Sequence, residues 1–191
     1  MERKFDAEAA QRLLSPERVE SLDIHHLLAL LPLRPYHTVA DVGCGPGYFT
    51  VPLAKFLRQG KVFAVDVQEE MLLMCRQQVE RARLSNVEVV RTEDASLPLA
   101  EASLDGAFLA FVLHEVQDRK AFMQAVAVTL KPGGWCAVVE WQPGPGELEG
   151  GPPPERRLGR QQVETLAKTV GMRLKEWREL NAAHYLALLT K

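Results

Sequence analysis

Three glycines at alternate positions follow a short apolar segment that contains an acid. Gly43, Gly45 and Gly47 come directly after residues 39–42, where Asp41 is the acidic residue. Glycine adopts backbone angles that other residues avoid, and it lets a ligand lie against the main chain. The apolar residues after the third glycine have helical spacing, so this stretch predicts a strand, a tight turn and a helix. In an open α/β sheet, such a unit binds a ligand at the carboxyl end of the strand.

The spacing of these glycines argues against a ligand that is held by its phosphates. In the dinucleotide-binding pattern G-x-G-x-x-G, the place of the third glycine corresponds to Tyr48, whose bulk fits poorly. A P-loop requires a Gly-Lys-Ser/Thr ending, and this turn contains no lysine. A ligand without phosphate is therefore favoured, and a nicotinamide-dependent oxidoreductase remains the alternative.

Two further acids follow the next two apolar segments. Asp66 ends residues 61–66, where a carboxylate can accept both hydroxyls of a ribose, although sites for NAD share such an acid. Asp94 can accept from an adenine amino group while the backbone N–H of Ala95 faces the ring. Asp41 lies where a cationic ammonium group would be bound. A ribose, an adenine and an ammonium group without phosphate describe S-adenosylmethionine.

Strands and helices alternate along most of the chain, which predicts a single α/β domain over residues 1–191 with a mostly parallel sheet. The last two strands are separated by residues 181–183 alone, so they should form an antiparallel hairpin. Residues 142–155 are rich in proline and glycine and should form a loop. The expected strands span residues 39–42, 61–66, 87–90, 104–111, 135–141, 173–180 and 184–190, and the expected helices span residues 16–31, 48–57, 68–83, 119–130 and 159–170.

Four segments, in this order, resemble the motifs of the class I S-adenosylmethionine-dependent methyltransferases. The likeness runs over residues 38–141, and it is greatest to the small-molecule enzymes of ubiquinone and menaquinone biosynthesis. It implies a Rossmann-like, doubly wound sheet of seven strands in the order 3-2-1-4-5-7-6, with an antiparallel last strand. The four segments are VADVGCGPGYFT, VFAVDV, TEDASLPLAEASLDGAFLAFVLHEV and LKPGGWCAVVEW.

The resemblance also implies a role for each residue of the cofactor site. Gly43, Gly45 and Gly47 would lie under the methionine part of the cofactor, and Asp41 would orient its amino group. The remaining contacts would be Asp66 to the ribose, Val67 to the adenine, Asp94 and Ala95 to the adenine edge, and the Phe111 backbone near the reacting methyl group.

One residue after the fourth expected strand and one at the end of the fifth are candidates for catalysis. Methyl transfer is an in-line displacement at an activated carbon, so alignment and exclusion of water supply much of the acceleration. A base is needed only where the acceptor must lose a proton. His114 is placed to act as that base or to orient the acceptor, and Glu140 to bind the acceptor. An ordinary loop histidine and a structural glutamate are the alternatives, and a non-catalytic S-adenosylmethionine-binding protein remains possible.

The start of the chain predicts a cap for the active site. Ser15-Pro16-Glu17 provides a capping hydroxyl, a proline at the first helical position and an acid in the first turn. A helix should therefore run from there to about Leu31. No added substrate domain is apparent, so residues 1–35 should form a helical cap over the site, which suits a small-molecule acceptor.

The composition is that of an ordinary globular protein. The chain has 191 residues, of which 47% are hydrophobic and 25% charged, and its net charge is -2. This charge gives no reason to expect nucleic acid or an anionic membrane as a partner. The three cysteines form no metal-binding cluster, and no signal peptide or membrane span is apparent. We therefore expect a cytoplasmic enzyme without a metal ion, with a homodimer as a possible assembly.

Overall fold

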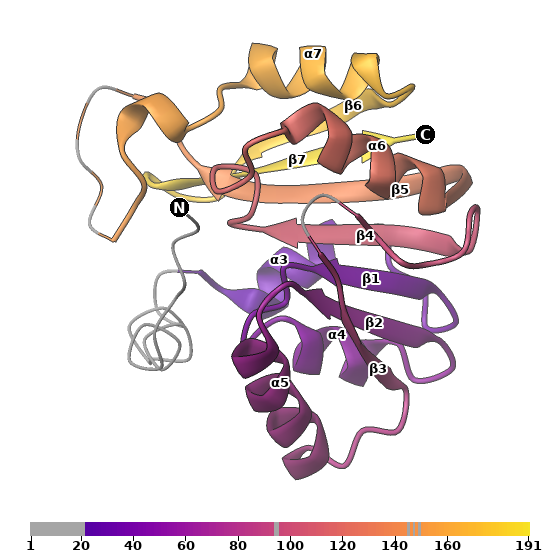
Figure 1. The fold of residues 1–191 in the computed structure, drawn as a ribbon. Helices are drawn as coiled ribbons and strands as arrows, with labels where there is room; N and C mark the ends of the chain where they lie inside the picture. Colours follow the sequence, from indigo (N-terminus) through magenta and orange to yellow (C-terminus); the bar gives the residue numbers. More distant parts are fainter. Residues whose placement is uncertain (1–21, 94–95, 145, 147, 149) are drawn as a thin grey trace. The chain divides into compact units, whose positions relative to one another are not determined.

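Seven strands form one sheet in the computed structural model, which describes residues 22–93, 96–144, 146, 148 and 150–191 (Figure 1). The order of the strands is β3-β2-β1-β4-β5-β7-β6. This order, with its antiparallel last strand, confirms the α/β fold expected from the sequence. The strands are β1 (Thr38–Val42), β2 (Lys61–Asp66), β3 (Val87–Arg91), β4 (Leu104–Ala110), β5 (Leu130–Trp141), β6 (Arg173–Glu179) and β7 (His184–Thr190).

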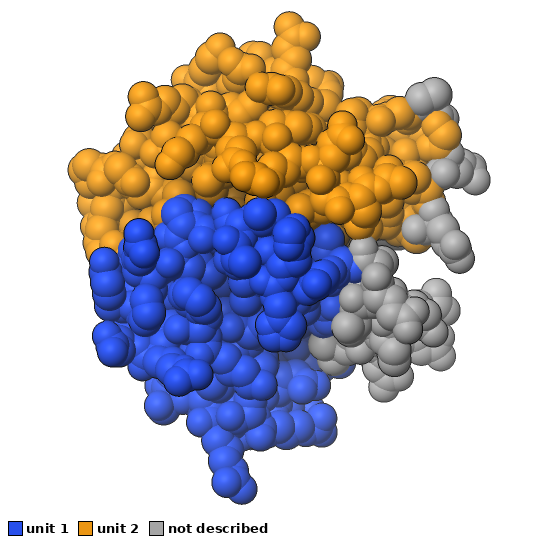
Figure 2. All heavy atoms as spheres, turned by 180° about the vertical axis from the view of Figure 1, so that it is seen from behind, with its two compact units in different colours: residues 1–94 blue, residues 95–191 orange. Residues whose placement is uncertain are grey.

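The chain divides into two compact units, residues 1–94 and residues 95–191, which Figure 2 colours separately. In the first unit, β1, β2 and β3 are parallel. Helices α4 (Thr50–Phe56) and α5 (Glu69–Arg81) pack against these strands. The buried residues of α5 recur at helical spacing and form one apolar stripe, which explains how an otherwise polar helix docks on the sheet. These residues are Met71, Leu72, Cys75 and Val79.

The second unit contains the predicted terminal hairpin. Strand β4 is parallel to β5, whereas β7 is antiparallel to both β5 and β6. The Asn181 side chain accepts hydrogen bonds from the backbone N–H groups of Ala183 and His184, both at 2.8 Å, which fixes the turn before β7. Helices α6 (Arg119–Thr129) and α7 (Arg160–Thr169) pack on the strands of this unit, and η1 (Pro154–Arg156) is a short 3-10 helix.

Strand β5 begins five residues earlier than expected, at Leu130 rather than Trp135. Leu130 pairs with Leu104 and Trp135 with Gly106, so the intervening residues of β5 bulge out of the ladder. Gly133 adopts a φ of 77° within this bulge. A side chain at Gly106 would lie 2.2 Å from the Trp135 ring, so this glycine is required for the indole to cross β4.

The predicted helix over residues 16–31 is wrong in its extent. Helix α3 spans Ile24–Leu30 and begins after Asp23, whose backbone is extended. The Asp23 carboxylate accepts from the N–H of His26 at 3.0 Å, so this acid starts a new helix instead of continuing an earlier one. Residues 1–21 lie outside the described part of the chain, and the cap over residues 1–35 stays a prediction.

Across the ranges that the structure describes, no helix combines the length and the apolar character needed to span a membrane.

Candidate functional site

The glycine turn after β1 is built around three left-handed residues. Gly43, Gly45 and Gly47 have φ angles of 73°, 53° and 93°. Residues with a Cβ adopt such angles at a cost of about 1–2 kcal/mol each, so glycine at these places lets the turn form without strain. The N–H groups of Gly43 and Cys44 both donate to the Val65 carbonyl, at 2.8 and 3.0 Å. These two bonds attach the start of the turn to the end of β2.

Asp66 ties the same turn to the carboxyl end of β2. Its Oδ2 accepts from the N–H of Gly45 and its Oδ1 from the N–H of Gln68, both at 2.9 Å. Burial raises the pKa of Asp66, and these backbone hydrogen bonds oppose the rise. A carboxylate has about four lone-pair positions, and the backbone of Val67 adds a third hydrogen bond, so one acceptor position remains for a ribose hydroxyl. The side chain therefore serves the turn and keeps capacity for a ligand.

Asp41 belongs to β1, directly before the turn, and is almost completely buried. The Thr50 hydroxyl donates to its Oδ2 at 2.6 Å. Burial raises the pKa of Asp41 to about 7, the Thr50 hydrogen bond opposes this rise, and the nearby Asp66 charge adds to it. Among the described residues, the Thr50 hydroxyl is the side-chain donor to this carboxylate, so a cation would relieve its unfavourable burial.

Val67 follows Asp66 directly and leaves 41% of its surface exposed. An apolar side chain at this place can cover one face of an adenine ring. Asp94 and Ala95, the other two residues predicted to contact adenine, lie outside the described residues. The structure thus brings five of the predicted cofactor residues together around one turn, and Val67 stands next to them in the chain.

Phe111 follows β4 in a left-handed conformation that is unusual for its residue type. Its φ angle is 62°, and its N–H donates to the Val139 carbonyl of β5 at 2.8 Å. Non-glycine residues held at positive φ cost energy and often mark functional places. The Phe111 ring lies 5.1 Å from the ring of His184 and 5.6 Å from that of Trp141, which in turn is 4.5 Å from His184. We call these three residues the aromatic cluster.

The two candidate catalytic residues contact each other. The Nδ1 atom of His114 lies 2.9 Å from Oε2 and 3.1 Å from Oε1 of Glu140. The carboxylate also accepts the N–H groups of His114 and Trp141, both at 3.2 Å. Only 1% of Glu140 is exposed. The carboxylate oxygens act as acceptors toward the two backbone N–H groups, and in the same role they favour the His114 tautomer that carries a proton on Nδ1.

Comparison with known proteins now adds to this geometry. The family model described as "Methyltransferase domain" matches residues 40–138, about half of the chain. A solved structure of an S-adenosylmethionine-dependent methyltransferase from Aquifex aeolicus is 31% identical, with a TM-score of 0.90, over 98% of this chain and 99% of that one. The chain belongs to the S-adenosylmethionine-dependent methyltransferase family.

The curated relatives match a smaller part of this methyltransferase than the Aquifex aeolicus structure does. The demethylmenaquinone methyltransferase of Bacillus cereus (strain ATCC 10987 / NRS 248) is 31% identical over 114 residues, which are 59% of this chain and 48% of the relative. That of Bacillus mycoides (strain KBAB4) is 30% identical over the same shares. The chain thus spans about half the length of the curated relatives it matches. The [4+2]-cyclase SpnF, at 16% identity and a TM-score of 0.75 over 100% of this chain and 84% of that one, shares the fold alone.

Several residues of this methyltransferase domain were missed by reasoning from sequence. Thr50 follows Asp41 by nine residues and starts α4, so a hydroxyl at a helix start after the acid was the available signal. His184 was assigned to the sheet, yet it joins the aromatic cluster. No sequence signal links it to Trp141, because the pairing follows from the register of β5 and β7.

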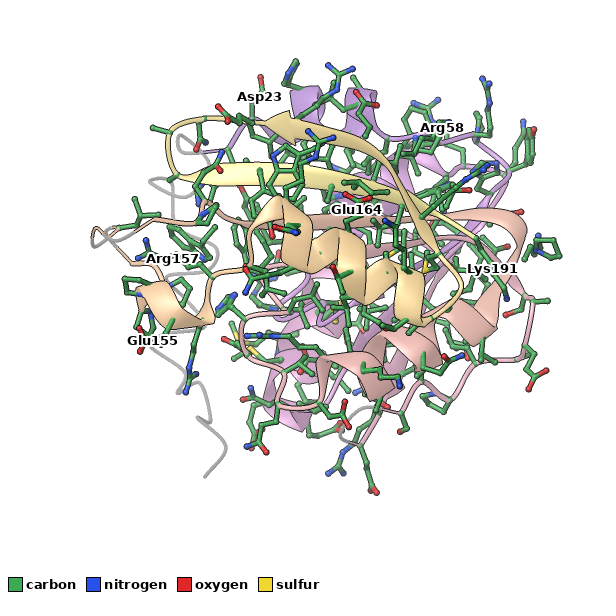
Figure 3. All side chains as sticks on the ribbon, turned by 90° about the horizontal axis from the view of Figure 1, so that it is seen from above. Asp23, Arg58, Glu155, Arg157, Glu164 and Lys191 are labelled. Carbon is green, nitrogen blue, oxygen red and sulfur yellow. The ribbon has the colours of Figure 1, made fainter. Side chains whose placement is uncertain are left out.

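Arg157 follows the segment that is rich in proline and glycine, residues 142–155. It is buried, and its guanidinium donates to the carbonyls of Pro152 and Gly146, both at 2.8 Å (Figure 3). Arg119 similarly donates to the Arg156 carbonyl at 3.2 Å. Both guanidinium groups therefore donate to backbone carbonyls of the described residues, which indicates a structural role for these two arginines.

Proposed function

We propose that this chain transfers a methyl group from S-adenosylmethionine to a small organic acceptor. The observation that carries the proposal is the pair of buried acids, Asp41 and Asp66, which flank one left-handed glycine turn. One acid suits an ammonium group and the other a ribose. Tyr48 stands at the place of the third glycine in the dinucleotide-binding pattern, which argues against a nicotinamide cofactor.

In the proposed reaction, the cofactor supplies a methyl carbon that positive sulfur has already activated. His114 would take a proton from the acceptor at Nε2, while Glu140 keeps Nδ1 protonated and stabilises the imidazolium that forms. The chain's own contribution is thus alignment, exclusion of water and one proton transfer.

The aromatic cluster supports a planar ring as the acceptor. Phe111, Trp141 and His184 present adjoining rings, and aromatic faces bind planar ligands by offset or edge contacts. The matched relatives are named for demethylmenaquinone, which agrees with a ring acceptor. We therefore propose a quinone-type or related aromatic compound as the acceptor class.

We also propose the cytoplasm as the location and a homodimer as the assembly. Cys44, Cys75 and Cys136 are all free, as is usual in a reducing compartment. Exposed Tyr36 and Phe56 offer apolar surface for self-association. Light scattering during size-exclusion chromatography would measure the assembly, and a monomer at all concentrations would rule the dimer out.

The central experiment combines calorimetry with a methyl-transfer assay. We expect S-adenosylmethionine to bind and NAD(H) not to bind, and soluble short-chain quinol analogues to receive labelled methyl groups. His114→Gln should lower kcat by about 100-fold while cofactor affinity stays within about threefold, since only the proton transfer is removed. His25→Gln is the matched control, because that histidine is exposed on α3 and lies in the other unit of the chain.

The outcomes separate the parts of this proposal. Binding of NAD(H) without S-adenosylmethionine would overturn the proposed function. Cofactor binding without transfer to any acceptor would indicate a non-catalytic binding protein. An unchanged kcat in His114→Gln would remove the base from the mechanism and leave the cofactor assignment in place.

A further inference from the structure

Two cysteines, one in the glycine turn and one in the helix that packs near it, belong to the same buried cluster. Cys44 is part of the turn and Cys75 belongs to α5, and both are buried in one cluster with Ala64 and Leu72. The two thiols interact directly with each other. The Cys75 sulfur also lies so close to Gly47 that a Cβ there would be 3.0 Å away. This thiol pair therefore connects the turn to the helix that supports it.

The two thiols have different chemical character. The Cys44 side chain holds the pKa of Cys75 below its usual range, and burial opposes this. The Thr50 hydroxyl gives its proton to Asp41, so at 3.8 Å it can only accept from the Cys75 thiol. The pKa of Cys44 is raised, by its interaction with Cys75 and by burial. A thiolate is the reactive form of cysteine, so Cys75 is the better nucleophile of the pair. Cys136 lies in the other unit, and burial raises its pKa to about 12.

We propose that Cys44 and Cys75 form an oxidisable dithiol, a modification site at which hydrogen peroxide produces a reversible disulfide. The Cys75 thiolate attacks one peroxide oxygen, the O–O bond breaks, and hydroxide leaves with a sulfenic acid on Cys75. The Cys44 sulfur then attacks the Cys75 sulfur, the S–O bond breaks, and water leaves as the S–S bond forms. Two thiols are oxidised, one peroxide is reduced, and two water molecules result.

The disulfide should change the cofactor site, a consequence that rests on the proposed function. Cys44 stands between Gly43 and Gly45, and the Gly45 N–H is bonded to Asp66. Drawing the Cys44 sulfur into a bond with α5 must move these neighbours, so cofactor affinity should fall by at least about tenfold. Both thiols are buried, so the oxidant reaches them when the turn opens. A cofactor bound on the turn should therefore slow the oxidation.

The experiment treats the reduced full chain with hydrogen peroxide, with and without S-adenosylhomocysteine. Peptide mapping by mass spectrometry should find one linkage, Cys44 to Cys75, with the loss of two hydrogen atoms, and dithiothreitol should reverse it. Cys136→Ser is the matched control and should form the same linkage. Cys75→Ser should form none. Should that variant not fold, the rate of iodoacetamide labelling at Cys75 against Cys136 in the wild-type chain replaces it, and Cys75 should react faster.

The covalent result and the cofactor result fail separately. Linkage through Cys136, bonds only between molecules, or separate over-oxidation of both thiols would overturn the dithiol. Equal labelling of Cys75 and Cys136 would also contradict it. A mapped Cys44–Cys75 disulfide in a chain that binds no S-adenosylmethionine would instead leave the modification site standing and remove the proposed function.

Discussion

Asp41→Asn should remove a pH dependence that this one buried acid gives to the folded chain. The pKa of Asp41 is raised from 3.8 to about 7, chiefly by burial. Between these two pH values, the unfolded chain has lost the proton and the folded chain still holds it. The folded state thus binds more protons than the unfolded state, and its free energy of unfolding falls as the pH rises. Below pH 3.8 both states are protonated, and Asp41 contributes no pH dependence there.

The size of this effect follows from the same two values. Each pH unit between them lowers the free energy of unfolding by up to about 1.4 kcal/mol, so the total approaches about 4 kcal/mol near pH 7. Asparagine stays neutral, and its amide oxygen can still accept the Thr50 hydroxyl. The free energy of unfolding of the wild type minus that of Asp41→Asn should therefore fall steadily from pH 4 to pH 7. Thr50→Val removes a donor to the carboxylate, so the decline should extend to higher pH.

Urea unfolding of wild type and variant, measured at pH intervals, checks the prediction, because subtraction removes the contribution of the other titrating groups. Calorimetry on the same samples tests the ligand side. If the cofactor's ammonium group pairs with ionised Asp41, wild-type affinity should increase as the pH is raised towards 7, by up to about tenfold for each pH unit. Above pH 7 the affinity should level off. Asp41→Asn should bind weakly at every pH. A stability difference that does not change between pH 4 and 7 would refute the reasoning.

Two further predictions concern the glycine turn. Gly47→Ala should lower the free energy of unfolding by about 2–3 kcal/mol, because the new methyl group adds a close contact with Cys75 to the strain of a left-handed backbone. Gly171→Ala should lower it by only about 1–2 kcal/mol, because Gly171 has a φ of 74° but open space around it, so only the backbone strain applies. Urea unfolding measures both, and equal losses would show that the contact costs nothing. Asp66→Ala should weaken cofactor binding by about 1.5–3 kcal/mol in calorimetry, and a change below about threefold would remove the ribose assignment.

The sheet could be predicted from the sequence because its strands carry a local signal. Residues 62–65 are apolar and lead to Asp66, and β2 has the expected bounds, Lys61–Asp66. Turn residues separate β6 from β7, so the hairpin was also predictable. The acids proposed for cofactor binding could be selected from the sequence for a related reason. Each lies at or near the carboxyl end of a strand, and parallel strands place their carboxyl ends at one edge of a sheet.

Contacts between distant segments could not be predicted in this way. His114 and Glu140 are 26 residues apart, and their hydrogen bond depends on where the chain turns after β4. Arg157 binds the carbonyl of Gly146 because the loop folds back on itself, and a composition rich in proline and glycine does not specify that path. The end of the first helix was local but ambiguous. Asp23 can lie within a helix or start one, and its extended backbone decides this.

Asp41, Asp66 and Glu140 differ in how far hydrogen bonds from the main chain compensate for their burial. Asp66 accepts two main-chain N–H groups, and Glu140 accepts two main-chain N–H groups and faces an imidazole. Asp41 accepts the Thr50 hydroxyl and is more deeply buried than Asp66. A charge with so little compensation is costly in the empty protein and is relieved by a cation. Asp41 is therefore the acid at which ligand charge, protonation and stability should be coupled most strongly.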